Sequence, residues 1–247
     1  MSMTSHRGEL DVPMPTIGGS SSVRAPGWLR RPRLTRLDRI ILAAILGYAA
    51  LLIGLAMRLS PERFSYTFSE AGPFEEMSIV LWVGASLAVL AFARPLTSRS
   101  AIFALLFAAF AAREASWHKA FTTDSLLKIS YYLKSPAPLT EKILAGIVAA
   151  TFIAMMIYVA IVVIRFLLVN EGLASRAGYW LVLAGVLFVL VKVADRTPSL
   201  VHDFTGQHIQ VDIWRLMKAF EEGFEMLTPA LFALAVWVSR TDRPFLS

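Results

Sequence analysis

The sequence predicts an all-α integral membrane protein, a bundle of six transmembrane helices with both termini in the cytoplasm. The chain is 56% hydrophobic with a mean hydropathy of +0.60, and it contains six charge-free apolar runs. Each run is long enough to form most of a bilayer-crossing helix. The runs are continuous rather than alternating, which favours helices over the strands of a barrel. They cover residues 40–57, 77–93, 100–112, 143–164, 177–191 and 226–239.

The segment before the first run predicts a basic N-terminal arm. Residues 1–36 contain no apolar stretch, and their glycines and serines favour disorder. The arginines at the end of this arm are expected to lie against anionic lipid headgroups. No small-residue cleavage site follows the first run, so the first helix is expected to be an uncleaved anchor. The predicted organisation is an arm at 1–36, a transmembrane domain at 37–240 and a tail at 241–247.

Basic residues predict the orientation. With the N-terminus inside, the inner segments hold thirteen of the twenty-four lysines and arginines but five of the eighteen acids. The positive-inside rule weighs short loops most, and the basic residues of loops 94–99 and 165–176 are all arginines. The net charge of +6 is therefore a topology signal, and without a stacking platform it does not indicate nucleic-acid binding. The absence of cysteine excludes disulfides, thiolate catalysis and cysteine-ligated metals.

Three helices need charged residues to cross the membrane. The runs 100–112, 177–191 and 226–239 are each shorter than the roughly 20 residues that a span requires. The second helix also carries acids, because Pro73 suits the first helical position and Glu75 and Glu76 then fall in the first turn. All these charges lie on the outer side of the predicted membrane. The residues that extend the three short runs are Arg113, Glu114, Trp117 and His118, then Lys192, Asp195 and Arg196, then Glu221, Glu222 and Glu225.

These charges are the candidate functional site. Ionisable groups within a span are rare, tend to face the bundle interior and indicate function. Several pairs, such as Glu114 with His118 and Lys192 with Arg196, share a helical face at a spacing of four. The alternative is that some are ordinary helix-end anchors at the headgroup boundary. The candidate acid/base groups are Glu114, Glu222 and Glu225, and the candidate anion-binding groups are Arg113, Lys192 and Arg196.

The side chains of Glu221 and Glu222 are expected to point in different directions. They are about 100° apart around a helix, so only one points squarely into the bundle. Glu222 is the preferred inward residue, because Phe220 and Phe224 predict a lipid-facing stripe beside Glu221.

Two outer segments frame the candidate site. Residues 118–142 predict a short amphipathic interfacial helix that ends near Ser135, with Thr140 capping the next transmembrane helix. Residues 195–214 predict a loop that is either a lid or a solvated connection.

A divalent metal is an alternative use of the same region. Its candidate ligands are His118, His202 and His208, assisted by nearby carboxylates. The H-E-x-x-H motif and the paired E-x-x-H pattern of helical di-iron bundles are both absent. The sequence specifies no other cofactor.

The stretch from Arg113 to Thr122 resembles a group of bacterial six-helix inner-membrane proteins with an R-E-x-x-x-H-K-x-F-T block. The resemblance extends to a K-x-x-D-R block at Lys192 to Arg196 and an E-E-x-x-E block at Glu221 to Glu225. It implies a location in the bacterial inner membrane and transfers no reaction. Glu76 and Ser78 give a looser likeness to membrane hydrolases of the alkaline ceramidase type, although the paired late histidines of that type are missing.

Three classes of function follow. The first is a membrane enzyme acting on a lipid or other amphiphile at the outer leaflet. The second is a non-catalytic assembly or sensor protein whose ion pairs fix the bundle, and the third is a proton-coupled carrier. The inner halves of the predicted helices lack charges, which counts against a carrier. Membrane lipids are the expected partners, and the sequence identifies no protein partner.

Overall fold

The computed structural model describes residues 32–69, 71–117, 122 and 127–246. These residues form eight α-helices and one short 3-10 helix, with no strand among them, which confirms the all-α class. Most of the predicted basic arm lies outside the described residues. The helices are α1 (Arg36–Arg58), α2 (Pro61–Thr67), α3 (Pro73–Phe92), α4 (Ser98–Glu114), α5 (Ile129–Lys134), α6 (Leu139–Leu168), η3 (Gly172–Ala174), α7 (Arg176–Thr205) and α8 (Val211–Ser239).

Four of these helices, α1, α3, α6 and α7, are long and apolar enough to cross a membrane. The chain is therefore compatible with a membrane protein. The other two predicted spans correspond to α4, which has 17 residues, and α8, whose first half is highly charged. Six spans and cytoplasmic termini stay predictions.

Several local predictions are confirmed and others are wrong. Pro73 opens α3 with Glu75 and Glu76 in its first turn, and a short helix, α5, ends just before Ser135. The position of α5 at a membrane interface stays a prediction. Thr140, however, does not cap α6, which begins at Leu139 after Pro138. Pro138 is itself the N-cap residue, so Leu139 occupies the first helical position and Thr140 already lies inside the helix.

The predicted loop at 195–214 is mostly helix. Helix α7 continues through Pro198 to Thr205, where Gly206 adopts a left-handed conformation, and α8 starts at Val211. The proline removes one backbone hydrogen bond without ending the helix, because α7 and α8 pack along each other. Helix α4 ends at Glu114, so Trp117 lies beyond the helix, and the expected pairing of Glu114 with His118 cannot be followed in the described residues. His118 itself lies outside the described residues.

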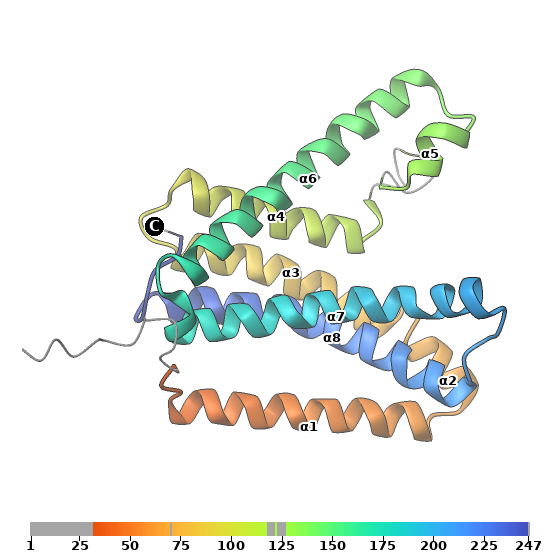
Figure 1. The fold of residues 1–247 in the computed structure, drawn as a ribbon, viewed down its shortest axis with the longest axis horizontal. Helices are drawn as coiled ribbons and strands as arrows, with labels where there is room; N and C mark the ends of the chain where they lie inside the picture. Colours follow the sequence, from red (N-terminus) through yellow and green to blue (C-terminus); the bar gives the residue numbers. More distant parts are fainter. Residues whose placement is uncertain (1–31, 70, 118–121, 123–126, 247) are drawn as a thin grey trace, which may run out of the picture.

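Helices α3, α7 and α8 form the centre of the bundle (Figure 1). Helix α1 packs on α8, and α4 packs on α3. Helix α6 leaves the bundle at an angle and carries α5 near its tip, so the two form an arm that points away from α1 (Figure 1). The start of α1 and the C-terminal residues lie at one end of the bundle, which we call the terminal end.

A buried ion pair closes the terminal end. The Asp38 carboxylate, which is fully buried, accepts hydrogen bonds from Arg176 Nε at 2.8 Å and from Trp180 Nε1 at 3.0 Å. Asp38 also forms a capping box with Thr35 at the start of α1. One side chain therefore caps α1 and attaches it to α7.

The residues after α8 strengthen this end. Asp242 Oδ2 accepts the backbone N–H groups of Arg176 and Ala177 at 2.6 and 3.2 Å, at the start of α7. Phe245 is buried against Phe103 of α4 and Phe166 of α6. The C-terminal segment thus joins three helices.

We expect Asp38→Asn to lower the free energy of unfolding by about 3 kcal/mol, because it leaves the Arg176 charge without its anion. The matched control is Glu62→Gln on α2, where the glutamate is exposed. Unfolding in mixed detergent micelles measures both variants. Equal stability of the two would show that the ion pair does not hold the bundle.

Candidate functional site

Helix lengths place charged residues from four helices at one depth. Counted from the terminal end of their own helices, Glu75, Glu114, Lys192 and Glu225 all lie about 21 to 26 Å along the axis. The hydrocarbon core of a bilayer is about 30 Å thick. A core that begins at the terminal end would therefore hold these residues in its far third.

The structure brings four predicted site residues together. Lys192 Nζ on α7 donates to Glu225 Oε1 on α8 at 2.5 Å. Arg113 Nη1 lies 3.6 Å from Glu114 Oε1 on α4. Glu114 also interacts electrostatically with Glu225 and Lys192, which joins the two pairs. Three helices therefore contribute to one cluster.

Lys218 is a member of this cluster that sequence reasoning missed. Its Nζ lies 2.7 Å from Glu222 Oε1 and 3.1 Å from Glu221 Oε1. Both glutamates also interact electrostatically with Glu225. The helical spacing could have identified Lys218, because it precedes the two glutamates by three and four residues on one helix. We call the following set the charged cluster: Arg113, Glu114, Lys192, Lys218, Glu221, Glu222 and Glu225.

The expected contrast between Glu221 and Glu222 is weak. Both side chains are largely shielded, and both contact Lys218. The predicted lipid-facing stripe is wrong, since Phe224 contacts the ring of Tyr48 on α1 at 6.2 Å edge to face. Tyr48 also donates to the Gly223 carbonyl at 2.9 Å, so this side of α8 packs on a neighbouring helix.

Among the remaining predicted residues, Glu75 interacts electrostatically with Glu114, and Asp195 with Glu221. Arg196 is 78% exposed, and its charge lies 3.8 Å from Asp195. His202 and His208 stack on each other with ring centroids 4.7 Å apart. Among the described residues, no three histidine, aspartate or glutamate side chains are grouped to hold a metal ion. The third candidate ligand, His118, is not among them.

Glu76 and Ser78 do not converge. Glu76 is exposed, whereas Ser78 is buried, as expected for residues two apart on a helix. Ser78 Oγ and Trp82 Nε1 share one face of α3, and within the described part of the chain neither has a hydrogen-bond partner.

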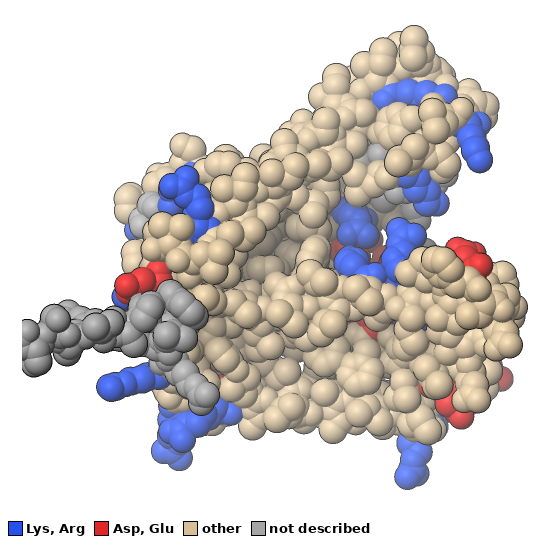
Figure 2. Space-filling view, in the orientation of Figure 1, with Lys and Arg blue, Asp and Glu red and all other residues tan. Residues whose placement is uncertain are grey.

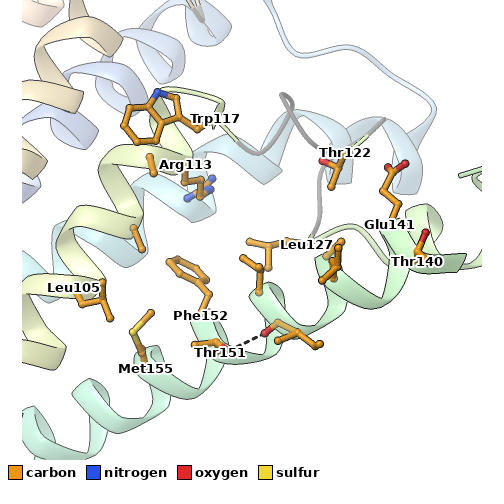
Figure 3. A pocket seen from close by; sticks show the side chains of 16 residues that line it. Leu105, Arg113, Trp117, Thr122, Leu127, Thr140, Glu141, Thr151, Phe152 and Met155 are labelled. Atoms are coloured by element: carbon orange, nitrogen blue, oxygen red, sulfur yellow. Dashed lines mark hydrogen bonds between the residues drawn. The ribbon is translucent and has the colours of Figure 1, made fainter. Parts of the chain in front are cut away.

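A large groove lies between α4 and α6, next to the cluster (Figure 3). Its volume is about 930 Å³, and Arg113 and Glu141 are the charged residues among those that line it. Figure 3 shows Glu141 at one end of the groove and Arg113 on its α4 side. The apolar lining includes Leu105, Ala109, Trp117, Leu144, Val148, Phe152 and Met155.

Helix α5 is fixed to the start of α6, at the mouth of the groove. Tyr131 Oη donates to Glu141 Oε1 at 2.7 Å, and Lys142 Nζ donates to the Ser135 carbonyl at 2.8 Å. Burial, together with the hydrogen bond to Glu141, raises the pKa of Tyr131 to about 12, so the phenol remains a donor at neutral pH. These hydrogen bonds therefore join α5 to the start of α6.

Comparison of the chain with protein families, with curated proteins and with solved structures finds no match. The resemblance to bacterial six-helix proteins stays a prediction, and part of its first block lies outside the described residues. The groove and the charged cluster are therefore the features of this chain from which a function can be inferred.

We expect Lys192 and Glu225 to stabilise the bundle as a pair. Lys192→Met alone should lower the free energy of unfolding by about 2 kcal/mol, because it leaves Glu225 shielded without its cation. Adding Glu225→Gln should recover at least about 1 kcal/mol of this loss. A double-mutant cycle measured by unfolding in micelles tests the coupling, and additive losses would contradict it.

Proposed function

We propose that this protein is a multi-pass enzyme of the bacterial inner membrane that acts on a lipid or another amphiphile at the outer leaflet. One observation carries the proposal: an apolar groove meets the charged cluster. Arg113 lines the groove, and its neighbour Glu114 belongs to the cluster. An amphiphile has an apolar part that suits the groove and a polar part that suits its charged end.

The groups at this end suit acid/base chemistry. Glu114 is the cluster carboxylate next to a groove-lining residue, so we assign it the proton transfer to or from the substrate. Glu225 interacts electrostatically with both Glu114 and Glu222, so these two further carboxylates can exchange protons with Glu114. Arg113 and Lys192 stabilise negative charge on the reacting group.

An assembly or sensor protein is the second candidate. The internal pairing of Lys192 with Glu225 and of Lys218 with Glu222 favours it, because such pairs satisfy buried charges without a ligand. We prefer the enzyme because Arg113 borders the groove in addition to its contact with Glu114. The proton-coupled carrier receives less support, since the cluster lies at one depth and the inner halves of the predicted helices lack charges.

The proposal includes six spans with both termini inside. Helices α4 and α8 complete the four apolar spans, and the terminal end then faces the cytoplasm. Arginines at 94, 99, 165, 176, 240 and 243 lie at or next to this end, as the positive-inside rule requires.

Single cysteines test this topology, because the chain has none of its own. An impermeant thiol reagent added outside should label Ser199→Cys on α7 and leave Ser98→Cys on α4 unlabelled. Both positions are exposed, whereas Ser175 is buried and unsuitable. The reverse labelling would overturn the orientation and the assignment to the outer leaflet.

Glu114→Gln tests the enzyme. We expect it to slow lipid turnover by at least about 100-fold, because a general acid/base group contributes that much or more. Purified protein in nanodiscs of bacterial lipid extract, sampled over time by mass spectrometry, measures the turnover. The exposed Glu62→Gln is the control and should keep full activity. If folded wild-type protein turns over no lipid, the assembly protein becomes the better conclusion.

A further inference from the structure

The groove between α4 and α6 has the length of a lipid chain in one leaflet. Its lining on α6 extends from Thr140 to Met155, which is about 22 Å along the helix. One leaflet contributes about half of the roughly 30 Å hydrocarbon core. The groove is therefore long enough to pass through the acyl region of one leaflet and reach its headgroups.

A second apolar concavity lies on α7. Its volume is about 300 Å³, and it is lined by Phe188, Val189, Lys192, Val193, Arg196 and Leu200. An aromatic contact separates it from the groove: the Phe110 ring lies 5.3 Å from Phe152 and 5.6 Å from Phe188, centroid to centroid. Phe152 lines the groove and Phe188 lines the concavity. Two apolar spaces therefore flank one aromatic partition.

Cations border both spaces. Arg113 lines the groove, and Lys192 and Arg196 line the α7 concavity. Figure 2 shows lysine and arginine side chains gathered in the cleft between the α5–α6 arm and the rest of the bundle.

Within the Arg113–Glu114 and Lys192–Glu225 ion pairs the cation is the more exposed partner. The exposed fractions are 39% for Arg113 against 12% for Glu114, and 31% for Lys192 against 17% for Glu225. The accessible face of the cluster is therefore positive, although acids outnumber bases within it.

From these observations we infer that the two spaces bind one diacyl phospholipid with an anionic headgroup, taken from the surrounding leaflet. One chain occupies the groove between α4 and α6, and the other occupies the α7 concavity. The phosphate lies between Arg113 and Lys192, whose charges complement it. This inference depends on the proposed function for the placement of these residues in the outer leaflet, and it names the class of substrate.

Native mass spectrometry of the delipidated full chain, titrated with defined lipids, tests the inference. Phosphatidylglycerol should bind one per chain, with a Kd at least about tenfold below that of phosphatidylcholine with the same chains. Arg113→Gln should reduce this preference, whereas Arg63→Gln, an exposed arginine on α2, should retain it. Lysophosphatidylglycerol, which has one chain, should bind more weakly than the diacyl lipid.

Paired substitutions test the two chain sites. Ala109→Phe fills the groove, whereas Ala108→Phe adds the same ring at an exposed neighbour outside the lining. On α7, Val189→Phe fills the concavity and Val186→Phe, also exposed, is its control. Each filling variant should weaken phosphatidylglycerol binding by about tenfold relative to its control, with an unchanged melting temperature.

The inference would be overturned if phosphatidylglycerol and phosphatidylcholine bound with equal affinity, or if the filling and control variants bound lipid equally. Either result would mean that the bound lipid only surrounds the protein without a specific site. A dimer that Ala109→Phe disrupts, with lipid binding unchanged, would assign the groove to a second copy of the chain and also overturn it. The titration reads binding without turnover, so a failed enzyme assay leaves its result intact.

Discussion

The Asp38 ion pair is the constraint on which the rest of the structure depends. It caps α1, neutralises Arg176 and accepts from the Trp180 indole, so it fixes α1 to the start of α7. The C-terminal segment fixes α4 and α6 at the same end through Phe245. With the helices joined at this end, they can diverge toward the other without loss of the fold. The groove between α4 and α6 is the result of that divergence.

The membrane class and most helices follow from the sequence for a simple reason. A span must be continuous and apolar, so the runs at 40–57, 77–93, 143–164 and 177–191 correspond to helices that are able to cross a membrane. The continuation of α7 beyond its apolar run was not predictable in the same way. Charged residues and Pro198 suggested a loop, whereas packing between α7 and α8 keeps both helices intact well past the cluster. Tertiary contact here outweighs local propensity.

The charged residues of the candidate site were predictable where helix length requires them. The groove was not predictable, because it depends on how the helices pack in space. Three apolar runs are shorter than a membrane span, and the residues needed to extend them include Lys192 and Glu225, which contact each other. Lys218 was missed because it lies outside the minimum span, although its spacing to Glu221 and Glu222 is helical. The groove gave no sequence signal, because residues such as Ala109 and Phe152 are also what a lipid-facing surface contains.

The chemistry of the site depends on where the charges lie rather than on how many there are. Counting residues gives an excess of acids on the predicted outer side of the membrane, which suggests a bound cation, protonated carboxylates or wide exposure to water. In the folded chain, Lys192 and Lys218 take up the Glu225 and Glu222 charges inside the bundle. Arg113 forms its pair at the edge, where it also borders the groove. A ligand that enters along the groove would therefore meet the Arg113 cation before the Glu114 carboxylate beside it. In the proposed enzyme, this order would hold the anionic part of the substrate next to Glu114.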